Sequence, residues 1–157
     1  MTRDDDEPVS ADAPNRLLWA LRRAELGARA LKEQRLRPLG LATAHYSLLM
    51  SVHGEPGLTG AELARRLDVT PQAVASLVTR LVDKGQLERQ SHPRHRHVQE
   101  LHLTDAGRQV LMSADVVVDS IEKQITERLG PDDAARLTAL LEAAIDAVRE
   151  TKPGTEP

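Results

Sequence analysis

The sequence has no cysteine and no phenylalanine, and it holds one tryptophan and one tyrosine among 157 residues. The absence of cysteine excludes disulfides, thiolate zinc sites and thiol redox switches. Almost all of the apolar content comes from Leu, Val, Ala and Ile, a composition that favours helices over strands. No apolar run approaches the length of a membrane span, and the acidic, proline-containing start does not resemble a secretory signal. We therefore expect a cytoplasmic protein without a membrane partner.

The formal net charge of −3 is unevenly distributed along the chain. Residues 60–100 hold seven Lys or Arg against five Asp or Glu, whereas residues 101–157 hold six against eleven. The segment Arg89–His97 contains three Arg and three His and no carboxylate, which makes it the strongest basic patch of the sequence. A local positive field of this kind indicates contact with a polyanion such as DNA, despite the acidic total.

Helix-breaking residues divide the chain into helices and one alternating segment, and the length suits a single domain with a core. Residues 1–14 and 152–157 lack apolar periodicity, so we expect disordered tails there. Apolar residues at steps of three and four predict helices over residues 15–37, 43–53, 59–67, 71–84 and 104–129, with a last helix after Gly130. Alternation over 87–103 predicts two strands around an exposed loop. The expected fold is mainly α with a small β-hairpin.

Each predicted element has an apolar face that we expect to be buried. In the third and fourth helices these positions are Ala61, Leu63, Ala64, Leu67, Val74, Leu77, Val78 and Leu81. In the hairpin they are Leu87, Leu101 and Leu103. In the last two helices they are Val110, Ala114, Val117, Ile121, Ile125, Leu137, Leu140, Leu141, Ala144, Ile145 and Val148.

Local signals mark the two short helices before the hairpin. Thr59 and Glu62 form a capping-box pattern, and Asn15 and Thr104 are expected to cap the first and fifth helices. Thr70 can cap the fourth helix, with Pro71 in its first turn and Gly85 after its end. Two short helices joined by a tight turn and followed by a basic hairpin indicate a winged helix-turn-helix, whose second helix enters the major groove.

The polar side of the helix over 71–84 lies opposite its apolar arc and suits contact with DNA. Gln can bond adenine through two hydrogen bonds, small side chains permit close approach, and Arg can reach guanine or phosphate. The expected DNA-contacting residues are Thr70, Pro71, Gln72, Ala73, Ser76, Thr79 and Arg80, with Arg94, Arg96 and His97 of the hairpin. The alternative is an ordinary polar surface helix, and the co-occurrence of both caps with a basic hairpin favours the DNA interpretation.

On these residues the run from Leu41 to Leu103 resembles the MarR (multiple antibiotic resistance regulator) family. The matching segments are Gly40-Leu41, Glu62-Leu63-Ala64, Thr70-Pro71-Gln72-Ala73-Val74, Leu81 with Gly85, and Leu103-Thr104-Asp105-Ala106-Gly107. The resemblance implies a DNA-binding lobe over residues 38–104 and helical dimerisation segments over 15–37 and 105–151. It also implies a homodimer that binds an inverted-repeat operator in double-stranded DNA as a repressor.

Members of the family commonly bind small aromatic or phenolic effectors, and the resemblance therefore implies a ligand site beside the dimerisation helices. The candidate lining residues are Trp19, His45 and Tyr46. The alternative for these residues is structural, with Trp19 in the dimer interface and Tyr46 in the core.

The hairpin departs from the family pattern at its histidines. His95 stands where the family usually has an Asp that orients the tip Arg, and His92 and His97 replace residues that are more often Asp and Arg. Arg96 is therefore expected to be held less firmly. The clustered histidines could bind a metal or sense protons, and without Cys or a clear carboxylate partner we expect neither a metal nor a cofactor. Protonation predicts tighter DNA binding as pH falls through the imidazole range.

Two other classes of function compete with this interpretation. An enzyme would need a nucleophile, an acid–base pair or a phosphate loop, and the sequence contains no GxGxxG, P-loop, HExxH or nucleophile-elbow motif. A winged-helix module that binds protein without DNA is the second alternative. Salt-titrated binding to duplex DNA distinguishes the three.

Overall fold

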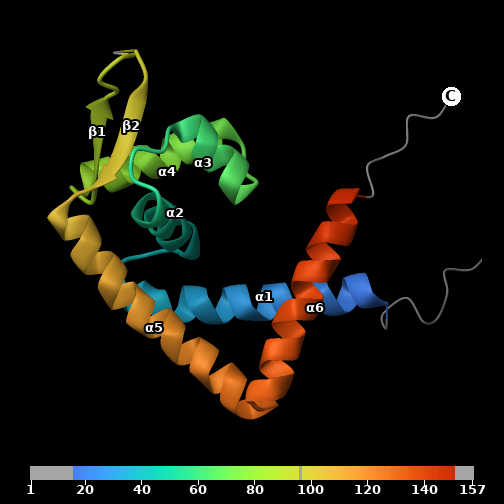
Figure 1. The fold of residues 1–157 in the computed structure, drawn as a ribbon. Helices are drawn as coiled ribbons and strands as arrows, with labels where there is room; N and C mark the ends of the chain where they lie inside the picture. Colours follow the sequence, from blue (N-terminus) through green and yellow to red (C-terminus); the bar gives the residue numbers. More distant parts are fainter. Residues whose placement is uncertain (1–15, 96, 151–157) are drawn as a thin grey trace, which may run out of the picture. The chain divides into compact units, whose positions relative to one another are not determined.

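The computed structural model describes residues 16–95 and 97–150, a helical fold with one two-stranded antiparallel sheet (Figure 1). The elements are α1 (Leu17–Leu36), the 3-10 turn η2 (Arg37–Leu39), α2 (Thr43–Gly54), α3 (Gly60–Leu67), α4 (Pro71–Asp83), β1 (Leu87–Ser91), β2 (Gln99–Leu103), α5 (Asp105–Leu129) and α6 (Pro131–Glu150). This order confirms the predicted fold class. None of the helices in these residues is long and apolar enough to cross a membrane.

The chain divides into two compact units, one reaching to Ala114 and one beginning at Asp115, and α5 runs through the boundary. Four of the predictions fall outside the described residues: the N-terminal tail, the C-terminal tail, the cap at Asn15 and the contact by Arg96. Arg16 occupies the N-cap position of α1 and makes no side-chain capping bond.

The first unit is organised around α2, α3, α4 and the hairpin. The α4 helix contacts α2, α3 and β1, and β2 contacts α2 and α3. Leu48, Leu49 and Val52 of α2 are fully buried at the centre of these contacts. Strand β1 pairs with β2 in the register Leu87↔Leu103 to Ser91↔Gln99, so Leu87, Leu101 and Leu103 point to the helices and are buried as predicted.

The capping predictions for α3, α4 and α5 are confirmed. The Thr59 hydroxyl oxygen accepts from the Glu62 amide, and the Glu62 carboxylate accepts from the Thr59 amide and hydroxyl. These hydrogen bonds to Thr59 lower the pKa of Glu62 below its ordinary value, because they favour the ionised carboxylate. The Thr70 hydroxyl oxygen accepts from the Ala73 amide (3.1 Å), and that of Thr104 accepts from the Gly107 amide (3.0 Å).

Burial differs from the predicted pattern in four helices, α3 to α6, and the difference in α4 is that Leu77 is half-buried. Ala61 is exposed and Leu67 half-buried, whereas Leu63 and Ala64 are buried as expected. In α5 the buried side chains are Leu111, Ala114, Val118 and Ile121, and the expected positions Val110, Val117 and Ile125 are half-buried or exposed. Apolar residues occupy more than one side of α5, so their spacing alone did not settle which side is buried.

The last difference concerns α6, which has no buried residue in the single chain. Leu140 and Val148, predicted to be buried, are 59% and 66% exposed. An apolar stripe predicts that a face will be covered, but it does not say whether the same chain covers it.

The start of α5 lies unusually close to the segment between α4 and β1. The Thr104 hydroxyl donates to the carbonyl of Gly85 (2.6 Å) while it accepts from the Gly107 amide. A Cβ built on Gly107 would stand 1.9 Å from the carbonyl oxygen of Gln86, which is backbone and cannot rotate away. A glycine is therefore required for the close approach at this joint.

We predict that Gly107→Ala lowers the free energy of unfolding by about 2 kcal/mol or more, because the new methyl group forces two backbone segments apart. Gly27→Ala is the matched control, since a Cβ on Gly27 in α1 meets nothing within 4 Å. That change should stabilise the protein by about 0.5–1 kcal/mol through helix propensity. Urea unfolding of the two variants measures both effects, and equal midpoints would contradict the close-approach argument.

Candidate nucleic-acid interface

The α4 helix has one buried and one exposed side. Val74, Val78 and Leu81 are buried, and Leu77 is half-buried. Gln72, Ala73, Ser76, Thr79 and Arg80, the five side chains predicted to read DNA from this helix, are all exposed. The helix therefore presents its polar face outward from Gln72 to Arg80, over about two and a half turns.

The turn that joins α3 to α4 fixes the entry of the second helix. Asp68 adopts a left-handed conformation (φ 51°), and the Val69 amide donates to the Ala64 carbonyl (3.1 Å), which closes the end of α3. Thr70 then caps α4, and Pro71 occupies its first turn, where no amide hydrogen is needed. Both Thr70 and Pro71 are exposed at the start of the helix. The first turn of α4 is thus free to approach a ligand.

Arg89 of β1 is a residue of this surface that the sequence reasoning did not single out. It shares a face of the sheet with Leu87 and Leu101, the face that lies toward the helices. Its guanidinium donates to the Thr79 hydroxyl on α4, at the long distance of 3.4 Å. The alternation Leu87-Glu88-Arg89 was the available signal, because it places Arg89 on the same side as Leu87.

The tip of the hairpin carries exposed basic side chains. Arg94 and His97 are both exposed, as a contact to DNA requires. The rings of His92 and His95 stack with centroids 5.1 Å apart, and those of His95 and His97 are 6.1 Å apart. Within residues 16–95 and 97–150 no group of three or more His, Asp or Glu side chains could hold a metal ion.

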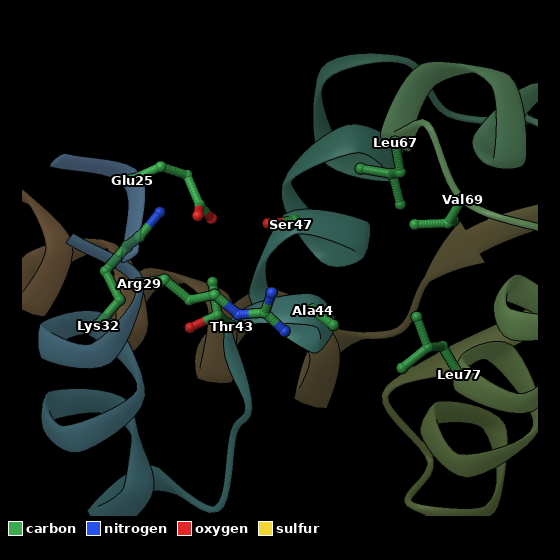
Figure 2. A pocket seen from close by; sticks show the side chains of 9 residues that line it. All are labelled: Glu25, Arg29, Lys32, Thr43, Ala44, Ser47, Leu67, Val69 and Leu77. Atoms are coloured by element: carbon green, nitrogen blue, oxygen red, sulfur yellow. The ribbon is translucent and has the colours of Figure 1, made fainter. Parts of the chain in front are cut away.

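A hollow of about 320 Å³ lies between α1, α2 and the α3–α4 region. Figure 2 shows Glu25, Arg29 and Lys32 of α1 on one side and Leu67, Val69 and Leu77 on the other, with α2 between them. Its remaining lining residues are Thr43, Ala44 and Ser47 of α2. The hollow therefore has an apolar wall and a charged wall, in which two cationic side chains stand beside one carboxylate, and it reaches α4 through Leu77.

The three residues suggested as ligand-lining are not brought together in this hollow, because none of them is among its lining residues. Trp19 is 49% exposed near the start of α1, and Tyr46 is half-buried on α2. His45 is buried, with 8% of its surface exposed. The lining residues come from three separate segments, so no local pattern in the sequence identifies them.

His45 has a structural role at the start of α2. Its Nδ1 accepts from the Ala42 amide (3.3 Å), while Nε2 is buried without a hydrogen-bond partner. Burial lowers the pKa of His45, and the charges of Lys84 and Arg80 lower it further against the opposing effect of Glu33. The imidazole is therefore held neutral, because a proton on Nδ1 would also leave the Ala42 amide unpaired.

These elements define a winged helix-turn-helix protein. It consists of a capped helix (α3), a tight turn, a second helix with an exposed polar face (α4) and a wing formed by the two strands β1 and β2. The sequence profile of the MarR family matches residues 39–96, which contain α2 to α4 and the first strand of the wing. The repressor Rv2887 of Mycobacterium tuberculosis is 32% identical over 107 residues, which are 68% of this chain and 77% of that protein. The chain belongs to the MarR family of transcriptional regulators.

Solved structures of the family show the same arrangement. The transcriptional repressor CouR bound to a 23-mer DNA duplex superposes with a TM-score of 0.81 at 28% identity, covering 88% of this chain and 99% of that one. CouR bound to p-coumaroyl-CoA gives a TM-score of 0.76 over 88% and 98%. Rv2887 in complex with salicylic acid gives 0.71 at 30% identity, over 87% and 99%.

The environment of His45 predicts a pH-dependent stability. Because its folded pKa lies below the unfolded value, its contribution is complete above about pH 6.5 and is lost as pH falls below that value. His45→Asn keeps an acceptor in the place of Nδ1 but does not titrate. We expect the free energy of unfolding to fall less between about pH 7.5 and 5.5 in this variant than in the wild type. Urea unfolding at both pH values measures the difference, and equal losses would refute the assignment.

Proposed function

We propose that this protein is a cytoplasmic, sequence-specific repressor that binds an inverted-repeat operator as a homodimer and has no enzymatic activity. The observation that carries the proposal is the exposed face of α4, where Gln72, Ser76 and Thr79 lie on a helix whose opposite side is buried. Gln72 suits adenine, and Arg80 suits guanine or phosphate at the flank of the helix. Arg94 and His97 of the wing add contacts to the backbone, which supply salt-dependent affinity.

The proposed homodimer uses the flanking helices. The α6 helix exposes Leu137, Leu140, Leu141, Ile145 and Val148 in the single chain, and α5 exposes Met112 and Val116. Apolar rows of this extent need a cover, and in a family of dimers a second copy of the chain is the simplest one. A two-fold axis would place two α4 helices in successive major grooves, so we expect half-sites about 10 base pairs apart.

The first test uses an operator selected from random duplex DNA. We expect Gln72→Ala to weaken binding by roughly 5- to 100-fold, because one bidentate base contact is lost. Gln109→Ala is the matched control, since it makes the same truncation at another exposed glutamine, which lies on α5. Fluorescence anisotropy across a salt series gives both the affinity and its salt slope.

Three results would count against the proposal. Equal affinities of the Gln72→Ala and Gln109→Ala variants for the operator would mean that Gln72 of α4 contacts no base. A wild-type protein that binds no duplex at low salt would favour the protein-binding alternative. A monomer at micromolar concentration in sedimentation would exclude the two-fold arrangement on DNA.

We further propose that the hollow beside α4 takes a small aromatic carboxylate that releases the protein from DNA. Arg29 and Lys32 supply positive charge for a carboxylate, and Leu67, Val69 and Leu77 supply an apolar wall for a ring. The salicylic acid complex of Rv2887 supports an aromatic carboxylate, and the p-coumaroyl-CoA complex of CouR supports a phenolic ring. Because Leu77 belongs to α4, occupation of the hollow can bias the placement of the DNA-reading helix.

Salicylate is the probe for this site. We expect it to release the operator complex, and we expect Arg29→Gln to raise the concentration for half-release by roughly three- to tenfold, as loss of a charged hydrogen bond would. Arg22→Gln removes the same charge from an exposed position of α1 outside the hollow and should have no effect. Anisotropy of the preformed complex measures the release, and equal shifts in the two variants would assign the effect to overall charge.

A further inference from the structure

The tip of the wing is held by the imidazole of His92. Its Nδ1 accepts hydrogen bonds from the backbone amides of Arg94 and His95, both at 3.1 Å. The backbone continues the strand pairing at this point, since the His92 amide donates to the Val98 carbonyl (2.9 Å). The Val98 amide in turn donates to the His95 carbonyl (2.7 Å). One side-chain nitrogen thus satisfies two backbone donors of the turn that carries Arg94.

The position of Glu100 explains why Nδ1 of His92 can accept hydrogen bonds. One carboxylate oxygen of Glu100 lies 3.7 Å from Nε2 of His92, and the other lies 3.2 Å from Nε2 of His102. A carboxylate beside Nε2 favours the tautomer with the proton on that atom, which leaves the lone pair of Nδ1 free for the two amides. The strand β2 therefore orients the ring whose opposite edge caps the turn.

We propose that His92 is a positioning residue of the DNA-binding wing: its neutral imidazole caps the tip turn and so presents Arg94 to the DNA backbone. The proposal rests on the DNA-binding function proposed above. A proton on Nδ1 would remove the acceptor from both amides, and the turn would lose the bonds that order it before binding. The affinity of the protein for DNA would then fall, because part of the binding free energy would be spent on ordering the turn.

The cap has the chemistry of an Asx turn in which the accepting atom can be protonated. Nδ1 of histidine stands one bond beyond Cγ, as does Oδ1 of asparagine or aspartate, which commonly accept from backbone amides two and three residues later. Asparagine accepts at every pH, whereas histidine accepts only while it is neutral. The order of the tip therefore depends on whether the His92 imidazole is neutral.

Other charged groups near the cap act with the opposite sign. The His95 ring stacks on His92, and His97 follows at the tip, so protonation of either adds positive charge toward phosphate. On the sheet face that carries Glu100 and His102, the strand pairing also places Glu88 opposite His102. The pH dependence of wild-type binding is consequently a sum of effects, and variants are needed to isolate the cap.

The test compares full-length wild type and His92→Asn on the selected operator at fixed salt. At about pH 8 the two dissociation constants should agree, because both side chains accept from the turn. At about pH 5.5 the wild type should bind roughly three- to tenfold more weakly than His92→Asn, as expected for loss of one or two hydrogen bonds. His92→Ala should already be weaker by a similar factor at pH 8.

His97→Asn is the control of opposite sign. It removes a wing histidine that takes no part in the cap. The dissociation constant of this variant, divided by that of the wild type, should therefore rise as pH falls. A ratio of wild type to His92→Asn that stays constant with pH, or a His92→Ala variant that matches the wild type at pH 8, would overturn the positioning role.

A measurement on the free protein separates the cap from DNA binding. The ¹⁵N shifts of the imidazole nitrogens in the wild type should show His92 with Nε2 protonated and Nδ1 bare at about pH 8. A proton on Nδ1 would overturn the cap without reference to DNA. If the tautomer is as expected but the wild type binds no duplex, the DNA-binding function fails and the positioning role falls with it, while the cap itself stands.

Discussion

Val74, Val78 and Leu81 set the rotation of α4 about its own axis, because all three are buried among α2, α3 and the hairpin. A rotation by one residue would carry polar side chains into this core at a cost of several kcal/mol. The direction of Gln72, Ser76 and Thr79 is therefore a consequence of apolar packing on the far side of the helix. The surface proposed to read bases depends on a core that never touches DNA.

The neighbouring elements reinforce this placement with polar contacts. The Lys84 ammonium at the end of α4 donates to the Gly40 carbonyl (3.0 Å), which ties the recognition helix to the segment before α2. Arg89 links β1 to Thr79, and the Thr104 hydroxyl joins the end of the wing to the turn after α4. The side chains proposed to read bases thus lie on a helix that several polar contacts hold in place. The hollow lined by Leu77 offers a place where a ligand can act on the same helix.

The elements that could be predicted are those fixed by local chemistry. Thr59, Thr70 and Thr104 form the caps expected of them, and alternation in the hairpin identified Leu87, Leu101 and Leu103 as buried. Local patterns did not reveal the buried side of α5, the exposure of α6 in a single chain or the lining of the hollow. These properties depend on contacts between segments distant in sequence. The His92 cap was missed for a different reason, because two consecutive amides and a carboxylate eight residues away define it together.

The absence of cysteine offers the most direct test of the central claim, since a single introduced thiol has no competitor. Asp83→Cys, exposed at the end of α4 and outside the residues expected to contact DNA, can carry an iron–EDTA group that cleaves nearby DNA. With α4 in the major groove, cleavage should fall in two clusters on the selected operator, one in each half-site and about 10 base pairs apart. Cleavage no stronger than that of the free reagent would contradict the account, because α4 would then not approach the bases.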